Sequence, residues 1–170
     1  FFRDAQGLWD EGPVTGMATR WVDGRPLTGA LATASLDVRV DAFGQLLDIV
    51  AYLHRRGLLH LDLKPENALY GDAGVVLLDL GSARPLDAGP GEAGGTLGYA
   101  APEVLAGQAA SIAADIFSLG AVLYELLTGQ GPYGGLRGTD LRRAALASGS
   151  SGSNANSVVS TLDPSTPAAA

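Results

Sequence analysis

The fold of this chain is decided by residues 60–67, which read His60-Leu61-Asp62-Leu63-Lys64-Pro65-Glu66-Asn67. Asp62 offers a carboxylate that can accept a proton, and Asn67 offers an amide oxygen that can bind a metal ion. Pro65 stiffens the loop between them, so both groups can be presented to one point. Lys64 adds a compact positive charge close to the carboxylate. The stretch predicts a loop that gathers a proton acceptor, a cation and a metal ligand.

Two further motifs follow this loop in the sequence. Asp79-Leu80-Gly81 comes directly after the apolar strand expected over residues 75–78. Ala101-Pro102-Glu103 comes after residues 81–100, a long loop rich in Gly, Ala and Pro. Taken singly, the first is usually a turn and the second an ordinary helix start, because Pro and Glu both suit the first turn of a helix. Their order after the loop at 60–67 favours a functional site.

The rest of the chain predicts several helices and little strand. The expected elements are a strand over 17–22, a turn at 23–26, helices over 41–57, 113–127 and 141–147, and a hairpin of 68–70 with 75–78. Gly57 and Gly129 are expected to end the first two helices. From residue 148 onward the chain is mostly Ser, Gly, Asn, Pro and Ala, which predicts a linker or disordered tail.

Composition excludes several classes of function. A length of 170 residues fits one domain, and a net charge of −7 argues against a surface for nucleic acid or anionic membrane. There are no cysteines, and the only histidines, His54 and His60, are too few for a histidine metal cluster. The longest apolar stretch, 112–127, contains Asp115 and Glu125, so it predicts a buried helix rather than a membrane span. No signal peptide is visible, and a cytoplasmic location is expected.

The order of these motifs resembles the protein kinase family, serine/threonine type. Loop 60–67 matches the pattern H-R-D-L-x-x-x-N at every fixed position but one, and the two later motifs match D-F-G, with Leu for Phe, and A-P-E. Three other segments also resemble this family: 17–24 the last strand of the N-terminal lobe and the hinge, 95–103 the substrate-binding segment, and 115–120 the start of the central helix. The resemblance covers about residues 15–133.

The resemblance implies a fold and a domain plan. The fold class is α+β and mainly helical, a protein-kinase-like C-terminal lobe with a remnant of the N-lobe sheet. Residues 1–24 are then the end of the N-lobe and the hinge, 25–147 an incomplete C-lobe, and 148–170 a tail. The form of loop 60–67 also resembles bacterial members of the family.

The resemblance also implies an activity, transfer of the ATP γ-phosphate to a serine or threonine of a protein substrate, with Mg²⁺ as cofactor. The implied catalytic residues are Asp62 as base, Lys64 on the phosphate, Asn67, and Thr96 bonded to both Asp62 and Lys64. The implied residues for ATP and metal are Thr19 as gatekeeper, the Arg20 carbonyl, the Val22 amide, Leu69 under the base, and Asn67 and Asp79 on Mg²⁺. Asp115 is implied to brace the backbone of the loop. No nucleic acid partner and no membrane segment are expected.

The sequence departs from the family at Leu61, where an Arg usually receives the phosphate of a modified loop residue. Between Ser82 and Thr96 there is no Ser, Thr or Tyr. Both features predict that phosphorylation in this loop does not switch the activity. Glu103 is expected to lack its usual Arg partner, since Arg142 and Arg143 are candidates by type only.

A second departure concerns the phosphate clamp. No Gly-rich loop precedes residue 17, and Lys64 is the only lysine, so the lysine that pairs with the α- and β-phosphates has no counterpart. The isolated chain is therefore expected to be nearly inactive. The alternative is a non-catalytic, pseudokinase-like binding module from a truncated gene.

Three other side chains have structural interpretations. His60 is expected to pack in the core and His54 to lie on the surface, facing away from the loop. Trp21 is expected to pack at the hinge.

Overall fold

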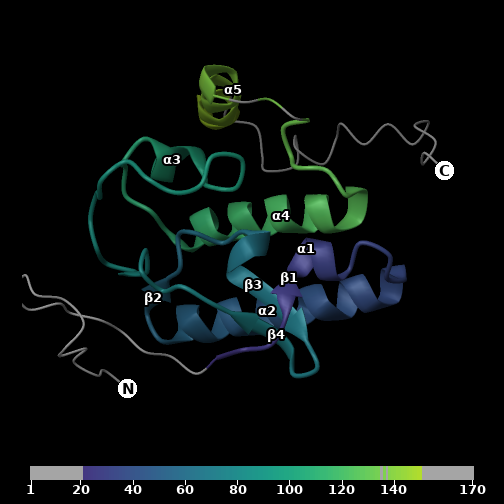
Figure 1. Ribbon diagram of the computed structural model, residues 1–170. Coiled ribbons are helices and arrows are strands. Elements are labelled where there is room, and N and C mark those ends of the chain that lie inside the picture. The colour runs from purple at the N-terminus through teal and green to yellow at the C-terminus, as the bar shows by residue number, and fades with distance from the viewer. Residues whose placement is uncertain (1–20, 135, 137, 151–170) are drawn as a thin grey trace, which may run out of the picture.

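The computed structural model describes residues 21–134, 136 and 138–150 (Figure 1). The strand predicted over 17–22 therefore falls mostly outside the described residues, together with Thr19 and Arg20. Most of the tail predicted from 148 onward also lies outside them. None of the helices in the described part is long and apolar enough to cross a membrane.

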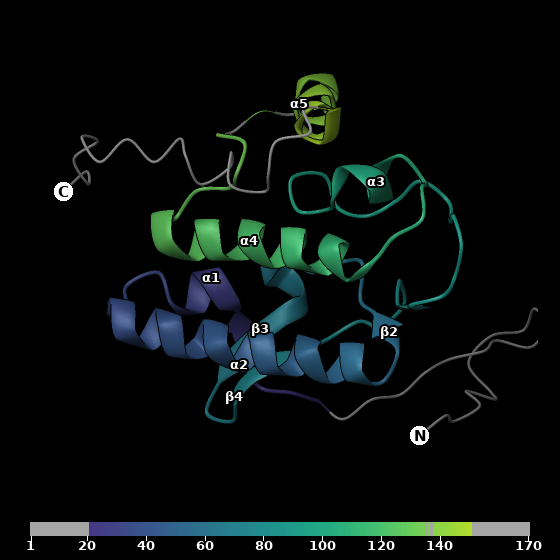
Figure 2. The same ribbon diagram turned by 180° about the vertical axis from the view of Figure 1, so that it is seen from behind.

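The described residues form a mainly helical domain with two small sheets. Helix α4 lies between a layer that contains α1 and α2 and a layer that contains α3 and α5, as both views show (Figures 1 and 2). The elements are β1 (Arg25–Pro26), α1 (Leu27–Ala30), α2 (Leu36–Arg55), β2 (Leu58–Leu59), a 3-10 turn (Pro65–Asn67), β3 (Ala68–Gly71), β4 (Gly74–Leu77), β5 (Arg84–Pro85), α3 (Pro102–Leu105), α4 (Ile112–Thr128) and α5 (Gly138–Ser150).

Helix α2 starts earlier than the predicted residue 41 because Ser35 caps it. The Ser35 side chain accepts a hydrogen bond from the Val38 amide at 3.5 Å, which satisfies one of the free N–H groups of the first turn. Asp37 adds a negative charge to that turn. Gly57 takes a φ of +76° two residues after the helix ends, a conformation that glycine adopts without strain.

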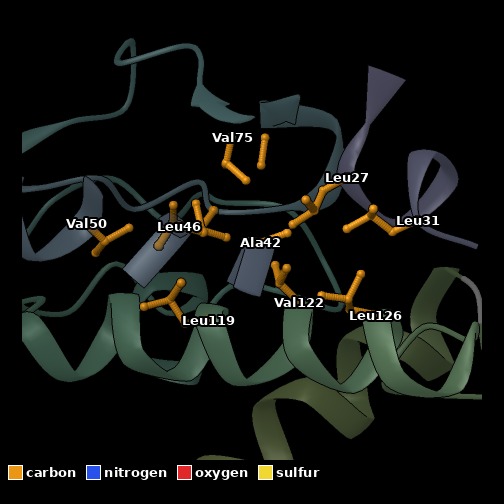
Figure 3. Packing of buried hydrophobic residues seen from close by; sticks show 11 residues of the cluster. Leu27, Leu31, Ala42, Leu46, Val50, Val75, Leu119, Val122 and Leu126 are labelled. Carbon is orange, nitrogen blue, oxygen red and sulfur yellow. The ribbon is translucent and has the colours of Figure 1, made fainter. Parts of the chain in front are cut away.

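Helix α4 confirms the predicted buried helix and carries the core. Ser111 caps its start by accepting from the Ala113 amide at 3.2 Å, and Gly129 ends it in the left-handed conformation with φ +71°. Its side chains Leu119, Val122 and Leu126 face α2, and Figure 3 shows them meeting residues of α2, α1 and β4. This core includes Leu27, Leu31, Ala42, Leu46, Val50, Val75, Leu119, Val122 and Leu126.

The predicted hairpin is present as β3 and β4, which pair antiparallel with Gly71 opposite Gly74. The turn predicted at 23–26 is wrong, because Arg25 and Pro26 instead form β1 and pair with Tyr70 and Leu69 of β3. Pro26 has no N–H to give to a ladder, and an edge strand tolerates that loss.

Helix α5 and the loop at 81–100 differ in smaller ways from the prediction. Helix α5 is longer than the predicted 141–147, and it packs on α3 through Ala145, which contacts Ala100 and Leu105. The long loop at 81–100 is not wholly irregular, since its residues 84–85 form β5 and pair antiparallel with β2.

Candidate active site

Loop 60–67 lies between β2 and β3 and is held by hydrogen bonds to α4. Asp115 is fully buried, and its Oδ2 accepts from the His60 amide and its Oδ1 from the Leu61 amide, both at 2.9 Å. A carboxylate that accepts backbone N–H groups forms charge-assisted hydrogen bonds, which are stronger than neutral ones. The first turn of α4 therefore fixes the backbone of the loop at His60 and Leu61.

His54 also binds Asp115, so its predicted surface position is wrong. Its Nε2 lies 2.8 Å from Asp115 Oδ2, and its side chain is only 11% exposed. His54 occupies the last turn of α2, on the side that packs against α4. The buried carboxylate thus joins two helices and the loop, and the histidine supplies a polar partner that a buried charge needs.

His60 is a structural residue, as predicted, and it is fully buried. The Asp62 amide donates to its Nδ1 at 3.3 Å, and its Nε2 lies 3.3 Å from the Leu78 carbonyl. These partners assign the neutral tautomer with the proton on Nε2, since one nitrogen must accept and the other must donate. His60 thereby ties the loop to the residue before Asp79.

The Asp62 carboxylate is held by three side chains. Thr96 donates from Oγ1 to Oδ1 at 2.6 Å, and Lys64 donates from Nζ to Oδ2 at 2.9 Å. Asn67 donates from Nδ2 to Oδ2 at 3.0 Å and to the Asp62 carbonyl at 2.8 Å. Lys64 also donates to Thr96 Oγ1 at 2.9 Å. The structure therefore brings all four predicted catalytic residues together.

Two opposite effects act on the pKa of Asp62. Burial raises this pKa, but the hydrogen bonds from Thr96, Lys64 and Asn67 and the positive charge of Lys64 outweigh burial and leave it below its ordinary value of 3.8. The Asp62 side chain remains 13% exposed and that of Lys64 23%. The site thus presents an ionised carboxylate to a partner arriving from solvent.

Asp79 follows β4 at the edge of the same loop. The Leu78 amide donates to the Asn67 carbonyl at 2.7 Å, which places the two motifs side by side. Asp79 has a φ of +55° and accepts from the Gly81 amide through Oδ1 at 3.0 Å. Aspartate tolerates this left-handed conformation better than most residues, because its short side chain bonds locally. Its side chain is exposed.

The predicted adenine contacts are only partly described. Leu69 lies in β3 opposite Pro26, and a Cβ placed on Gly24 would lie 3.2 Å from its Cβ. Val22 is partly exposed in the chain that leads to this contact. Trp21 is 83% exposed and donates from Nε1 to Asp23 at 2.8 Å, so its predicted packing is wrong.

A second polar cluster, not expected from the sequence, lies around the Tyr99 hydroxyl. Glu125 of α4 accepts from the Tyr99 hydroxyl and, at 3.1 Å, from Thr28 Oγ1 of α1. Burial and the adjacent Glu125 carboxylate raise the pKa of Tyr99. The available signal was a glutamate inside a largely apolar helix, since a charge placed there needs a partner.

That Glu103 lacks an arginine partner stays a prediction, and no ion pair of Glu103 is present within residues 21–134, 136 and 138–147. Arg143 instead pairs with Asp140 one turn earlier in α5, at 3.3 Å and exposed to solvent.

Comparison with known proteins agrees with this geometry. The model of the protein kinase domain family matches residues 16–162. Serine/threonine-protein kinase PknJ of Mycobacterium tuberculosis is 41% identical over 128 residues, which is 69% of this chain and 22% of that protein. Calcium/calmodulin-dependent protein kinase cmkA of Emericella nidulans is 48% identical over 105 residues, 57% of this chain and 25% of that protein.

These relatives are far longer than the chain, which spans a quarter or less of their length. They come from a bacterium and a fungus, so a bacterial origin stays a prediction. With the family matched over residues 16–162 and serine/threonine kinases among its relatives, the chain belongs to the protein kinase domain family and is of the serine/threonine type.

Proposed function

We propose that this chain carries the phosphoryl-transfer site of a kinase that modifies serine or threonine in a protein substrate. It forms the C-terminal lobe over residues 25–147, and residues 1–24 belong to the hinge and the adjoining N-lobe. One observation carries the proposal: the Asp62 carboxylate is bonded at once to Lys64, Asn67 and Thr96 while part of it stays open to solvent. The proposed activity consumes ATP and therefore includes a cytoplasmic location, where ATP is supplied.

Asp62 orients the substrate hydroxyl and accepts its proton. A carboxylate whose pKa lies below 3.8 is a weak base toward an alcohol, so it cannot remove the proton before the reaction starts. In the loose transition state of phosphoryl transfer, the hydroxyl becomes acidic only as its bond to phosphorus forms. Asp62 therefore acts first by alignment and takes the proton late.

Lys64 and Thr96 complete this arrangement. Lys64 lies between the carboxylate and the Thr96 hydroxyl at 2.9 Å from each, so its ammonium group can neutralise charge on a phosphoryl group in transfer. Thr96 belongs to the segment expected to bind the substrate peptide. Its bond to Asp62 couples the position of that peptide to the position of the base.

The residues at Asn67 and Asp79 fit a magnesium ion. Both Asn67 bonds run from its amide nitrogen to Asp62, which fixes the amide so that its oxygen is the group left to bind a cation. Asp79 adds an exposed carboxylate next to Leu78, whose amide donates to the Asn67 carbonyl. One or two such oxygen ligands, completed by phosphates and water, suit Mg²⁺. When bound, the ion neutralises charge on the phosphates. Thr19, the Arg20 carbonyl, the Val22 amide and Leu69 are proposed around the adenine.

The test is phosphate transfer from ATP to serine or threonine by the full protein that contains this chain. Asp62→Asn keeps the shape and removes the carboxylate, so kcat should fall about 10²- to 10⁴-fold. Asp48→Asn, on the exposed side of α2, is the matched control and should leave kcat unchanged. Equal rates for Asp62→Asn and the unaltered protein would refute the proposal.

A separate assay addresses the 170-residue chain alone. Lys64 is its only lysine, and positioning of the phosphates supplies most of the catalysis in this reaction, so its turnover should be near background. Turnover by the isolated chain that disappears in Asp62→Asn would show this expectation to be wrong.

A further inference from the structure

Leu61 gives loop 60–67 an apolar contact where the family resemblance leads one to expect an arginine. It is only 8% exposed despite a backbone φ of +65°, a left-handed conformation that is unfavourable for a non-glycine residue. The hydrogen bond from its amide to Asp115 holds that conformation. The side chain is thereby directed into a cluster of buried residues instead of toward solvent.

This cluster joins the two ends of the loop at 81–100. Leu61 packs with Leu59, Ala101 and Ala114, and Leu86 and Val104 pack against them. Leu86 comes near the start of the loop, whereas Ala101 and Val104 follow its end. Burial of apolar surface holds both ends against loop 60–67.

Arg84 holds the middle of the loop. Its backbone is fixed by the pairing of β5 with β2, and its Nη2 donates to the Gly89 carbonyl at 3.0 Å. Gly91 leaves room for the guanidinium, since a Cβ on that residue would lie 2.1 Å from Nη1. The side chain therefore closes residues 84–91 into a compact turn around its own charged group.

The next residues rest on the turn after α3. The Gly94 amide donates to the Val104 carbonyl at 3.3 Å. Gly107 has a φ of +70°, and a Cβ there would lie 3.0 Å from both the Gly91 oxygen and the Ala93 nitrogen. The backbones thus approach as closely as glycine allows, and Thr96 follows directly, bonded to Asp62.

We propose that Arg84 is a positioning residue. By binding the Gly89 carbonyl, its guanidinium holds residues 89–95 in place. This keeps Thr96 beside Asp62 without phosphorylation of the loop. The guanidinium binds a backbone carbonyl, which needs no modification to be present. Leu61 packs against residues at both ends of the loop. The proposal rests on the proposed function only for its effect on catalysis. The order of the loop can be measured independently of catalysis.

Hydrogen exchange on the 170-residue chain measures that order. Arg84→Gln should speed exchange of the amides of residues 86–95 about 5-fold, the effect of losing one modest hydrogen bond, with little change elsewhere. Gly91→Ala should act in the same way by displacing the guanidinium. Arg25→Gln is the matched control, because Arg25 also donates to a backbone carbonyl, that of Gly29 at 3.3 Å. It should leave residues 86–95 unchanged.

Kinetics of the full protein provide the second readout. Arg84→Gln should raise KM for the protein substrate several-fold with a smaller change in kcat, and Arg84→Lys should restore part of the loss. Unchanged exchange in residues 86–95 of Arg84→Gln would overturn the proposal. Faster exchange in a protein that transfers no phosphate would keep Arg84 as a loop clamp and reject the proposed function instead.

Discussion

Replacing Asp115 by asparagine tests how firmly the loop is anchored to α4. The carboxylate accepts from Leu61 on one oxygen and from His60 on the other, with His54 also within 2.8 Å of the second oxygen. An asparagine has one acceptor oxygen and an NH₂ group that can only donate. In either orientation, the NH₂ group faces a buried backbone N–H, so at least one amide of the loop loses its partner.

The expected loss follows from these contacts. A buried donor left without a partner costs about 1–3 kcal/mol, and hydrogen bonds to a charged group contribute about 1.5–3 kcal/mol against 0.5–1.5 for neutral ones. His54 can relieve part of the loss by changing tautomer, because its ring nitrogens can exchange donor and acceptor roles. We therefore expect Asp115→Asn to lower the free energy of unfolding by about 3 kcal/mol.

Urea denaturation followed by circular dichroism measures this change. With an m-value of about 1.5 kcal/mol/M, the midpoint should fall by about 2 M. Asp48→Asn, an exposed change of the same chemistry on α2, should shift the free energy by no more than about 0.5 kcal/mol. A loss below about 1 kcal/mol for Asp115→Asn would refute the claim that this carboxylate anchors the loop.

The lowered pKa of Asp62 and the raised pKa of Tyr99 each make the stability of the chain depend on pH. Since the pKa of Asp62 is lowered, its contribution to stability is present above about pH 4 and is lost as pH falls through the folded value. Thr96→Val removes one donor, so carbon NMR should show a higher pKa for Asp62; an unchanged pKa would contradict the bond. Since the pKa of Tyr99 is raised by burial and Glu125, its contribution is present below about pH 10 and is lost at higher pH. Tyr99→Phe should lower the free energy of unfolding at pH 7 by about 1–2 kcal/mol and should lose less stability between pH 10 and 11 than the unaltered chain; equal losses would reject the prediction.

The motifs with local causes could be predicted from the sequence. The bounds of α4 follow from Ser111 and Gly129, because a cap and a left-handed glycine act within one turn of the helix. The hairpin of β3 and β4 follows from its turn in the same way. The bonds of Thr96 to Asp62 and Lys64 could be predicted from the family resemblance, because the spacing of residues within 60–67 identifies the loop.

Contacts between distant segments could not be predicted. His54 lies 61 residues from Asp115, and its position depends on how α2 packs on α4. The two-residue strand β1 has no hydrophobic period that a pattern could reveal, and its pairing depends on the close passage of Gly24 over Leu69. The apolar spacing places the start of α2 at residue 41, later than the cap at Ser35 sets it.

The bonds around Asp62 also limit where a substrate can be received. A carboxylate has about four lone-pair positions, and donors from Thr96, Lys64 and Asn67 occupy three of them. The position that remains is on Oδ1, beside Thr96, because Oδ2 already accepts twice. Under the proposed function, an incoming hydroxyl then has one direction of approach, and any water that takes this position blocks it. The direction of a single unoccupied lone pair would then decide which substrate hydroxyls can bind Asp62.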